Sequence, residues 1–127
     1  MFNQKNSKKQ GDVGVGSAIS YFTSKGWVVL IPLSDSQDYD LAFDSGKGVK
    51  TVQIKTSRFK RRKDFYEVNL RVCGGNKSRQ TIKNFNPNKV DYVYILLEDG
   101  NRYLIPSKDI EAKTSITIYE KYEKYRL

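Results

Sequence analysis

The sequence predicts an α/β domain in which an N-terminal helix packs on a mixed central β-sheet. Apolar residues recur at helical spacing before Gly26, and beyond it they alternate or form short runs of strand length. One helix followed by several strands can cover a face of the sheet that those strands form. The chain has 127 residues and no repeat, low-complexity tract or linker, so residues 1–127 are predicted to be a single domain.

A helix is predicted from Ser7 to about Lys25. Ser7 to Gln10 fits a capping box, and Gly26 is suited to follow the last turn. The apolar stripe at helical spacing consists of Val15, Ala18, Ile19 and Phe22.

Three glycines, Gly11, Gly14 and Gly16, interrupt this helical pattern. Each disfavours a helix by about 1 kcal/mol relative to Ala. Either the sheet or a phosphate backbone approaches these glycines closely, or the helix begins only after Gly16.

Two period-two segments, residues 38–44 and 50–56, are predicted to form a β-hairpin around Gly46-Lys47-Gly48. Their apolar side chains share one face: Tyr39, Leu41, Phe43, Val52 and Ile54. The polar side chains of Asp40, Gln53 and Lys55 therefore share the opposite face. One register pairs Asp40 with Lys55, Leu41 with Ile54 and Phe43 with Val52; a slip by one residue would mix the two faces.

The other strands are predicted on either side of this hairpin. Trp27–Pro32 has the pattern of a buried strand that ends at proline. Residues 74–89 form a long polar loop, and a hairpin turn at 98–101 joins two later strands. The remaining strands are predicted at 65–72, 90–97 and 102–105, with an edge strand at 114–118 and a short helix or tail from Tyr119.

Composition excludes several classes of protein. The chain has no histidine, which excludes histidine-based acid–base catalysis and serine–histidine triads. Cys73 is the single cysteine, so no intramolecular disulfide and no cysteine-based zinc site is possible, and a reducing, cytoplasmic location is expected. No apolar run has transmembrane length, and no signal peptide is present, so no membrane role is expected.

The net charge of +9 is concentrated in the middle of the chain. Residues 47–89 contain 13 Lys and Arg but only two acids, Asp64 and Glu67. Such a block favours a nucleic-acid partner over a merely solvated basic surface. The residues predicted to contact it are Arg58, Lys60, Arg61, Arg62, Lys63, Lys77, Arg79 and Lys83. Phe59, within this block, is either a core residue or a base-stacking residue.

The polar face of the hairpin has the donors that phosphodiester hydrolysis needs. Mg²⁺ prefers oxygen ligands, which the Asp40 carboxylate, the Gln53 amide and the Ile54 backbone carbonyl can provide. Lys55 can orient or deprotonate the attacking water, or bind a phosphate oxygen. Asp38 and Asp44 are predicted to be loop and turn residues rather than ligands.

Asp40 followed by Gln53-Ile54-Lys55 resembles the motif of PD-(D/E)XK nucleases, with Gln53 in place of the second acid. The branch that includes group I intron-encoded homing endonucleases also uses Gln-x-Lys. The other matching segments are Gly11–Gly14, Gly26–Val29, Pro32, Tyr39–Leu41, Val52–Thr56, Val90–Tyr92 and Tyr103–Pro106. The resemblance implies a restriction-endonuclease-like fold and a homo-oligomeric (dimer or tetramer) endonuclease. It further implies cleavage of double-stranded DNA with Mg²⁺, for which Mn²⁺ substitutes.

The chain departs from this family pattern in its first helix, where the family has Glu and this chain has Val15. Asp12, one turn earlier, is the nearest substitute and a candidate catalytic residue; alternatively, it is a first-turn acid favoured by the helix dipole. The alternative function is therefore a catalytically weak or inactive nucleic-acid-binding module on the same fold. The basic block disfavours a structural or protein-binding domain.

Overall fold

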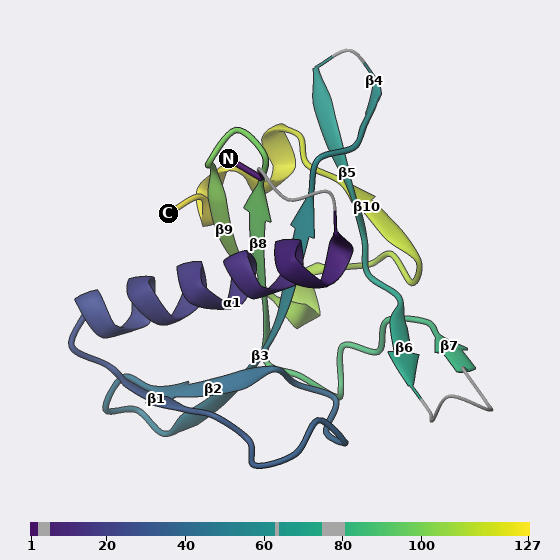
Figure 1. Ribbon diagram of the computed structural model, residues 1–127. Coiled ribbons are helices and arrows are strands. Elements are labelled where there is room, and N and C mark those ends of the chain that lie inside the picture. The colour runs from purple at the N-terminus through teal and green to yellow at the C-terminus, as the bar shows by residue number, and fades with distance from the viewer. Residues whose placement is uncertain (3–5, 63, 75–80) are drawn as a thin grey trace.

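A computed structural model describes residues 1–2, 6–62, 64–74 and 81–127. Helix α1 (Ser7–Ser24) lies across one face of a five-stranded sheet (Figure 1). The strand order is β1-β2-β3-β8-β9, and β3 and β8 are parallel whereas the other neighbours are antiparallel. The bounds are Val28–Leu30 for β1, Leu41–Asp44 for β2, Val49–Ser57 for β3, Tyr92–Leu97 for β8 and Arg102–Pro106 for β9. The predicted α/β domain with a mixed sheet and a covering N-terminal helix is confirmed.

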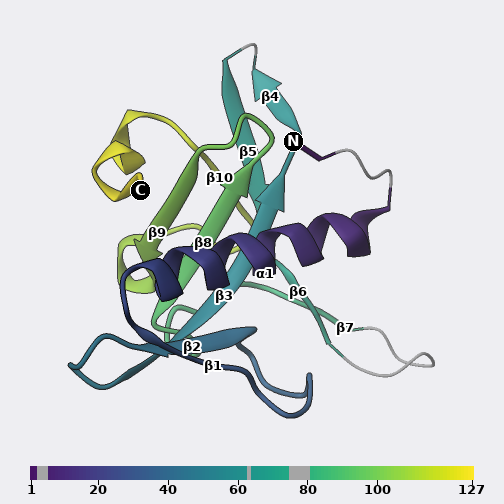
Figure 2. The same cartoon turned by 60° about the vertical axis from the view of Figure 1, so that its left-hand side comes forward.

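Two smaller sheets are built from strands that follow β3 in the sequence. One has the order β10-β5-β4, with bounds Ser115–Thr117, Phe65–Asn69 and Lys60–Arg62. The other pairs β6 (Val72–Gly74) with β7 (Thr81–Lys83). In Figure 2, β4 and β5 extend away from the body of the domain, and the β6–β7 ribbon leaves it lower down. Short 3₁₀ helices, η1 (Ser107–Asp109) and η2 (Glu120–Tyr125), follow β9 and β10.

Three predicted elements differ from the observed ones. The predicted strand at 65–72 is divided between β5 and β6, and β6–β7 occupies part of the predicted loop at 74–89. The strand after Trp27 is not buried, because β1 is the edge of the sheet and the side chains of Val28 and Leu30 are exposed.

The cap of α1 is one residue earlier than predicted. The Asn6 side chain accepts a hydrogen bond from the Lys8 N–H, so Asn6 rather than Ser7 is the N-cap residue. Gln10 does not close a capping box; its side chain donates to the Thr56 hydroxyl on β3 instead (2.9 Å).

The sheet approaches the helix at Gly14. A Cβ at this position would lie 2.6 Å from Thr56 Cγ2 and 3.1 Å from Ile54 Cγ2. At Gly11 and Gly16 a Cβ would meet open space. Close approach of the sheet therefore explains only Gly14. The alternative start after Gly16 is wrong, because α1 begins at Ser7.

Two hydrophobic cores cover the two faces of the sheet. Between α1 and the sheet, Ala18 and Phe22 pack with residues that include Leu41, Phe43 and Val52. Val15, predicted on the apolar stripe, is half-buried and is not among the described residues packed against this core. The second core joins the opposite face to β5 and β10, through Val93 and Ile95 among others.

Candidate active site

The candidate site lies where β2 begins, beside the middle of β3. Leu41 pairs with Val52, so the register predicted from the sequence, with Leu41 opposite Ile54, is wrong by two residues. A shift of two residues preserves the faces within the strands, so Gln53 and Lys55 share the face opposite α1. The alternation breaks before β2, because Tyr39 packs against the core opposite α1 whereas Leu41 packs on the α1 side, so the prediction that these two share a face is wrong.

Asp40 is held against β3 by two hydrogen bonds. Its backbone N–H donates to the Val52 carbonyl (2.9 Å), and its carboxylate Oδ2 accepts from the Ile54 N–H (2.7 Å). The N–H and C=O of one strand residue point to the same side of the strand. The Ile54 carbonyl therefore points to the Asp40 side of β3.

The electrostatic environment of Asp40 favours its neutral form. The residue is exposed as a whole, but its carboxylate lies against β3, and this loss of solvation raises its pKa above the usual 3.8. The Ile54 N–H and the charge of Lys55 act in the opposite direction. A cation at the carboxylate would reverse the effect of desolvation.

Gln53 is buried, with 6% of its surface exposed, and its side chain lines a cavity of about 190 Å³. The cavity is also lined by Asp38 and Lys83. Asp38, predicted to be a loop residue, does lie in the loop before β2, and it also lines this cavity, which the strand pattern did not indicate.

Lys55 extends from β3 towards the end of β5. Its Nζ donates to the backbone carbonyl of Arg71 (2.7 Å), which follows β5. Its charge still lowers the pKa of Asp40. Lys55, the neighbour of the Ile54 that binds Asp40, is thus held in a fixed direction, as a residue that acts on a phosphate must be.

These donors fit a hard divalent cation. The Asp40 carboxylate, the Gln53 amide and the Ile54 carbonyl are all oxygen donors, as Mg²⁺ and Mn²⁺ require. Within the described ranges, no group of three His, Cys, Asp or Glu side chains is placed to hold a metal. Any metal here would therefore depend on neutral oxygens and water as well as on a carboxylate.

Asp12 and Val15 lie on α1, which packs on the face of the sheet opposite Gln53 and Lys55. Asp12 is two residues from Gly14, which faces the sheet, so it is on the far side of the helix and is exposed. The predicted role of Asp12 at the metal stays a prediction.

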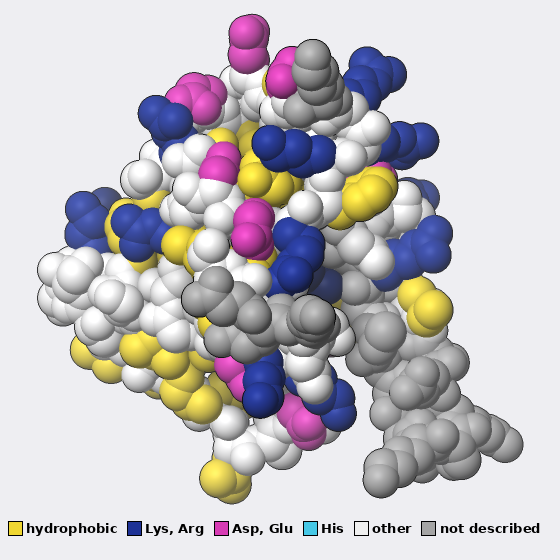
Figure 3. Space-filling view, turned by 45° about the horizontal axis from the view of Figure 1, so that its top comes forward, with side chains coloured by type: hydrophobic (Ala, Val, Ile, Leu, Met, Phe, Trp, Pro, Cys, Tyr) yellow, Lys and Arg dark blue, Asp and Glu magenta, His cyan; other side chains and the backbone are white. Residues whose placement is uncertain are grey.

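The predicted nucleic-acid contacts fall into different environments. Lys60, Arg61 and Arg62 are exposed on β4, where the Lys60 ammonium also lies 4.8 Å from the centre of the Tyr66 ring. Lys83 lines the Gln53 cavity. Lys63, Lys77 and Arg79 lie outside the described residues. Figure 3 shows many Lys and Arg side chains on the right-hand side of that view, with few acidic ones among them.

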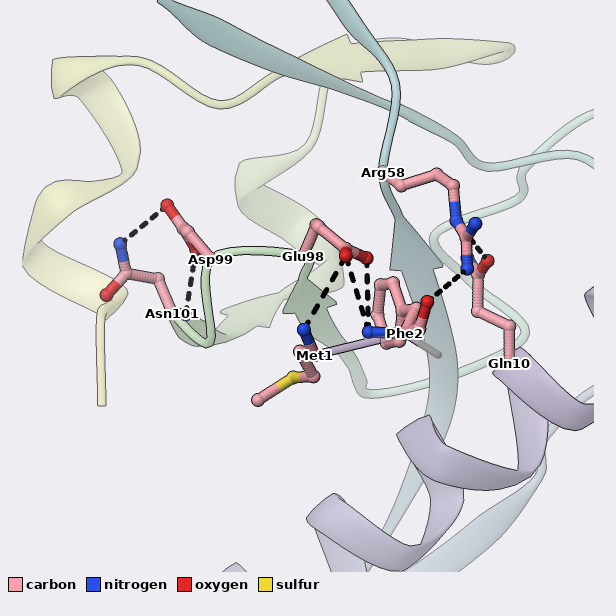
Figure 4. Close-up of polar contacts among 7 residues, drawn as sticks. All are labelled: Met1, Phe2, Gln10, Arg58, Glu98, Asp99 and Asn101. Carbon is pink, nitrogen blue, oxygen red and sulfur yellow. Dashed lines mark hydrogen bonds and ion pairs between the residues drawn. The ribbon is translucent and has the colours of Figure 1, made fainter. Parts of the chain in front are cut away.

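Arg58 differs from the others because it connects three parts of the chain (Figure 4). Its Nε donates to the Gln10 side chain (3.0 Å), and a terminal nitrogen donates to the Phe2 carbonyl (3.0 Å). The Phe2 N–H in turn donates to the Glu98 carboxylate (3.3 Å). Arg58 thus holds residues 1–2 and the first turn of α1 to the end of β3.

No described helix is long and apolar enough to cross a membrane.

Comparison with known proteins agrees with this geometry. The family model described as PD-(D/E)XK endonuclease matches residues 5–126. The solved structure of a bacterial homing endonuclease, I-Ssp6803I, superposes with a TM-score of 0.78 at 27% identity, covering 95% of this chain and 88% of that one. The structure of MepB has the same fold, with a TM-score of 0.51 at 17% identity, covering 89% of this chain and 95% of that one. No curated protein matches the chain.

Proposed function

This chain belongs to the PD-(D/E)XK endonuclease family, and we propose that it is a divalent-metal-dependent endonuclease that hydrolyses phosphodiester bonds in double-stranded DNA. The observation that carries the proposal is the Asp40 carboxylate bound to the N–H of Ile54, which lies between Gln53 and Lys55 on β3. The similarity to a homing endonuclease supports the same activity.

The oxygen donors of the hairpin would hold the ion. The Asp40 carboxylate, the Gln53 amide and the Ile54 carbonyl are the proposed ligands, and Mg²⁺ is the proposed ion, with Mn²⁺ as a substitute. A bound ion of this kind polarises a phosphate oxygen and activates a water molecule. Asp12 is retained as a candidate that assists this site.

Lys55 is proposed to act on the phosphate and the attacking water. Its bond to the Arg71 carbonyl fixes the direction of the side chain before substrate binds. A positive charge held in advance stabilises the negative charge that develops on the phosphate in the transition state.

The partner proposed for the exposed cations on β4 is the DNA backbone. Lys60, Arg61 and Arg62 are exposed on a strand that extends from the domain, as phosphate contacts must be. One such site cuts one strand, so we expect a homo-oligomer (a dimer or tetramer) to place two sites on a duplex.

A second candidate function is favoured by the few carboxylates at the site. Val15 and Gln53 leave Asp40 as the one carboxylate among the proposed ligands. A nucleic-acid-binding module with little or no activity would keep the same basic surface.

Incubation of a supercoiled plasmid library carrying a randomised insert with Mg²⁺ distinguishes the two functions. A nuclease linearises or nicks members of the library, and Lys55→Ala lowers the rate by about 100-fold or more. If the wild type cleaves no member, or Lys55→Ala cleaves equally well, the proposed activity is wrong.

A binding module instead binds labelled duplex DNA in EDTA, with a steep dependence on salt and no cleavage. Val15→Glu adds the missing carboxylate to α1, and cleavage by this variant alone would identify a site that lacks one acid.

A further inference from the structure

A cavity of about 490 Å³ lies next to Lys55, between the first turn of α1, the end of β3, and strands β5 and β10. Thr56, the neighbour of Lys55 on β3, lines this cavity. Arg71, whose carbonyl accepts the hydrogen bond from Lys55, also lines it. The volume is in the range of cavities that bind small ligands. A DNA strand that passes Asp40 and Lys55 would therefore reach this cavity next.

Phe59 presents an aromatic ring to the cavity from a fixed backbone. The ring is exposed, with 61% of the residue surface accessible, which excludes the core role that the sequence left open. The Phe59 carbonyl accepts from the Glu67 N–H (2.9 Å), and its N–H donates to the Ser57 hydroxyl (3.2 Å). Ser57 is itself buried and donates to the Glu67 carbonyl. An exposed ring held in this way is suited to pack against a base or a sugar.

The charges around the cavity favour an anion. The Asn69 side chain accepts from the Arg71 N–H (2.9 Å) and so fixes the backbone at the position that also orients Lys55. None of the ion pairs among the described residues involves Arg71. The Glu67 carboxylate is neutralised by Arg61 (3.3 Å) and accepts from the Ser115 hydroxyl (2.9 Å).

We propose that this cavity binds one nucleotide of the DNA strand beside the phosphate that is cleaved, with Phe59 against its base or sugar and Arg71 near its phosphate. The part of this inference that places the nucleotide beside a cleaved phosphate rests on the proposed function. Holding the neighbouring nucleotide would fix the reacting phosphate relative to Lys55, and such positioning accelerates reactions.

The test uses 2′-deoxyadenosine 5′-monophosphate as the probe, in EDTA at low salt, with binding followed by amide chemical shifts. We expect the largest changes at Phe59, Asn69 and Ser115. Phe59→Ala weakens binding by about 5-fold to 140-fold, the range for loss of one base–aromatic contact. Phe65→Ala is the matched control, because Phe65 is also exposed (38%) but is not one of the lining residues of this cavity.

Binding that is unchanged in Phe59→Ala, or equally weakened in Phe65→Ala, would overturn the inference. So would shifts confined to the cations of β4. Cleavage of the plasmid library, measured in parallel, separates this inference from the proposed function. A wild type that cleaves DNA but binds the nucleotide independently of Phe59 disproves the cavity alone. A wild type that does not cleave but binds it through Phe59 disproves the nuclease alone.

Discussion

Replacing Gly14 by Ala tests how α1 is held against the strand that carries the candidate site. The added Cβ would lie 2.6 Å from Thr56 Cγ2 and 3.1 Å from Ile54 Cγ2, so the helix or β3 must move. Rotation of Thr56 does not relieve the contact easily, because its hydroxyl accepts the hydrogen bond from Gln10. Ile54 and Thr56 are also the two neighbours of Lys55, so the strain acts on the site itself.

The magnitude follows from three terms. Overpacking destabilises by about 1–3 kcal/mol, and loss of the Gln10–Thr56 hydrogen bond adds about 1 kcal/mol. Replacing glycine inside a helix stabilises by about 1 kcal/mol. The net loss for Gly14→Ala is therefore about 1–3 kcal/mol, or roughly 4–12 °C in Tm for a domain of this size.

Gly16→Ala is the matched control, since its Cβ meets open space in the same helix. We expect it to raise the free energy of unfolding by up to about 1 kcal/mol, because only the propensity term remains. Thermal and urea unfolding followed by circular dichroism measure both variants. If Gly14→Ala is as stable as Gly16→Ala, the close approach of β3 to the helix is wrong.

Three other predictions concern charged residues, one in the site and two in the basic block. Asp40→Asn abolishes cleavage yet raises Tm at pH 7 in the absence of metal, because the raised pKa means that folding disfavours the carboxylate. For the same reason, the free energy of unfolding of the wild type falls as the pH rises from 3.8 through the pKa of folded Asp40. The Tm difference between Asp40→Asn and the wild type therefore shrinks on acidification. A Tm difference that grows on acidification would contradict this direction of the pKa shift. Arg58→Ala lowers the free energy of unfolding by about 1–3 kcal/mol by breaking its bonds to Gln10 and Phe2. Arg62→Ala leaves stability unchanged but lowers the salt slope of DNA binding by about one; equal salt slopes in the two variants would contradict the distinction between these arginines.

The faces of the residues within β2 and β3 could be predicted, whereas their register and the face of Tyr39 could not. Alternation fixes which side chains share a face, but any shift by two residues preserves the faces. The turn decides the register: Asp44 Oδ1 accepts from the N–H groups of Gly46 and Gly48, and both glycines have φ of +101°. This pairs Asp44 with Val49, and nothing in the strand pattern itself indicates that length of turn.

Contacts between distant segments were also beyond sequence reasoning. Lys55 is bonded to a backbone carbonyl 16 residues later, and a carbonyl has no sequence signature. Arg58 is in a run of cations, but its partners are on α1 and at the start of the chain. The helix, strands β2 and β3 and the shared face of Gln53 and Lys55 depend on local periodicity, which explains why these could be predicted.

Substitution of Gln53 tests most directly whether this residue and Asp40 face a common cation. The Gln53 side chain is buried next to Ile54, whose N–H binds the Asp40 carboxylate, so Gln53→Glu would place a second carboxylate near a first whose pKa is already raised by desolvation. Without metal, like charges and burial both penalise the ionised pair, and we expect the variant to unfold at a lower temperature than the wild type at pH 7. A divalent cation neutralises the pair, so Mg²⁺ should raise the Tm of Gln53→Glu by more than that of the wild type. Differential scanning fluorimetry with EDTA and with Mg²⁺ measures both shifts, and Glu120→Gln, exposed on η2, serves as a control for carboxylates outside the hairpin. Equal Mg²⁺ shifts in Gln53→Glu and the wild type would show that Gln53 and Asp40 do not face a common ion.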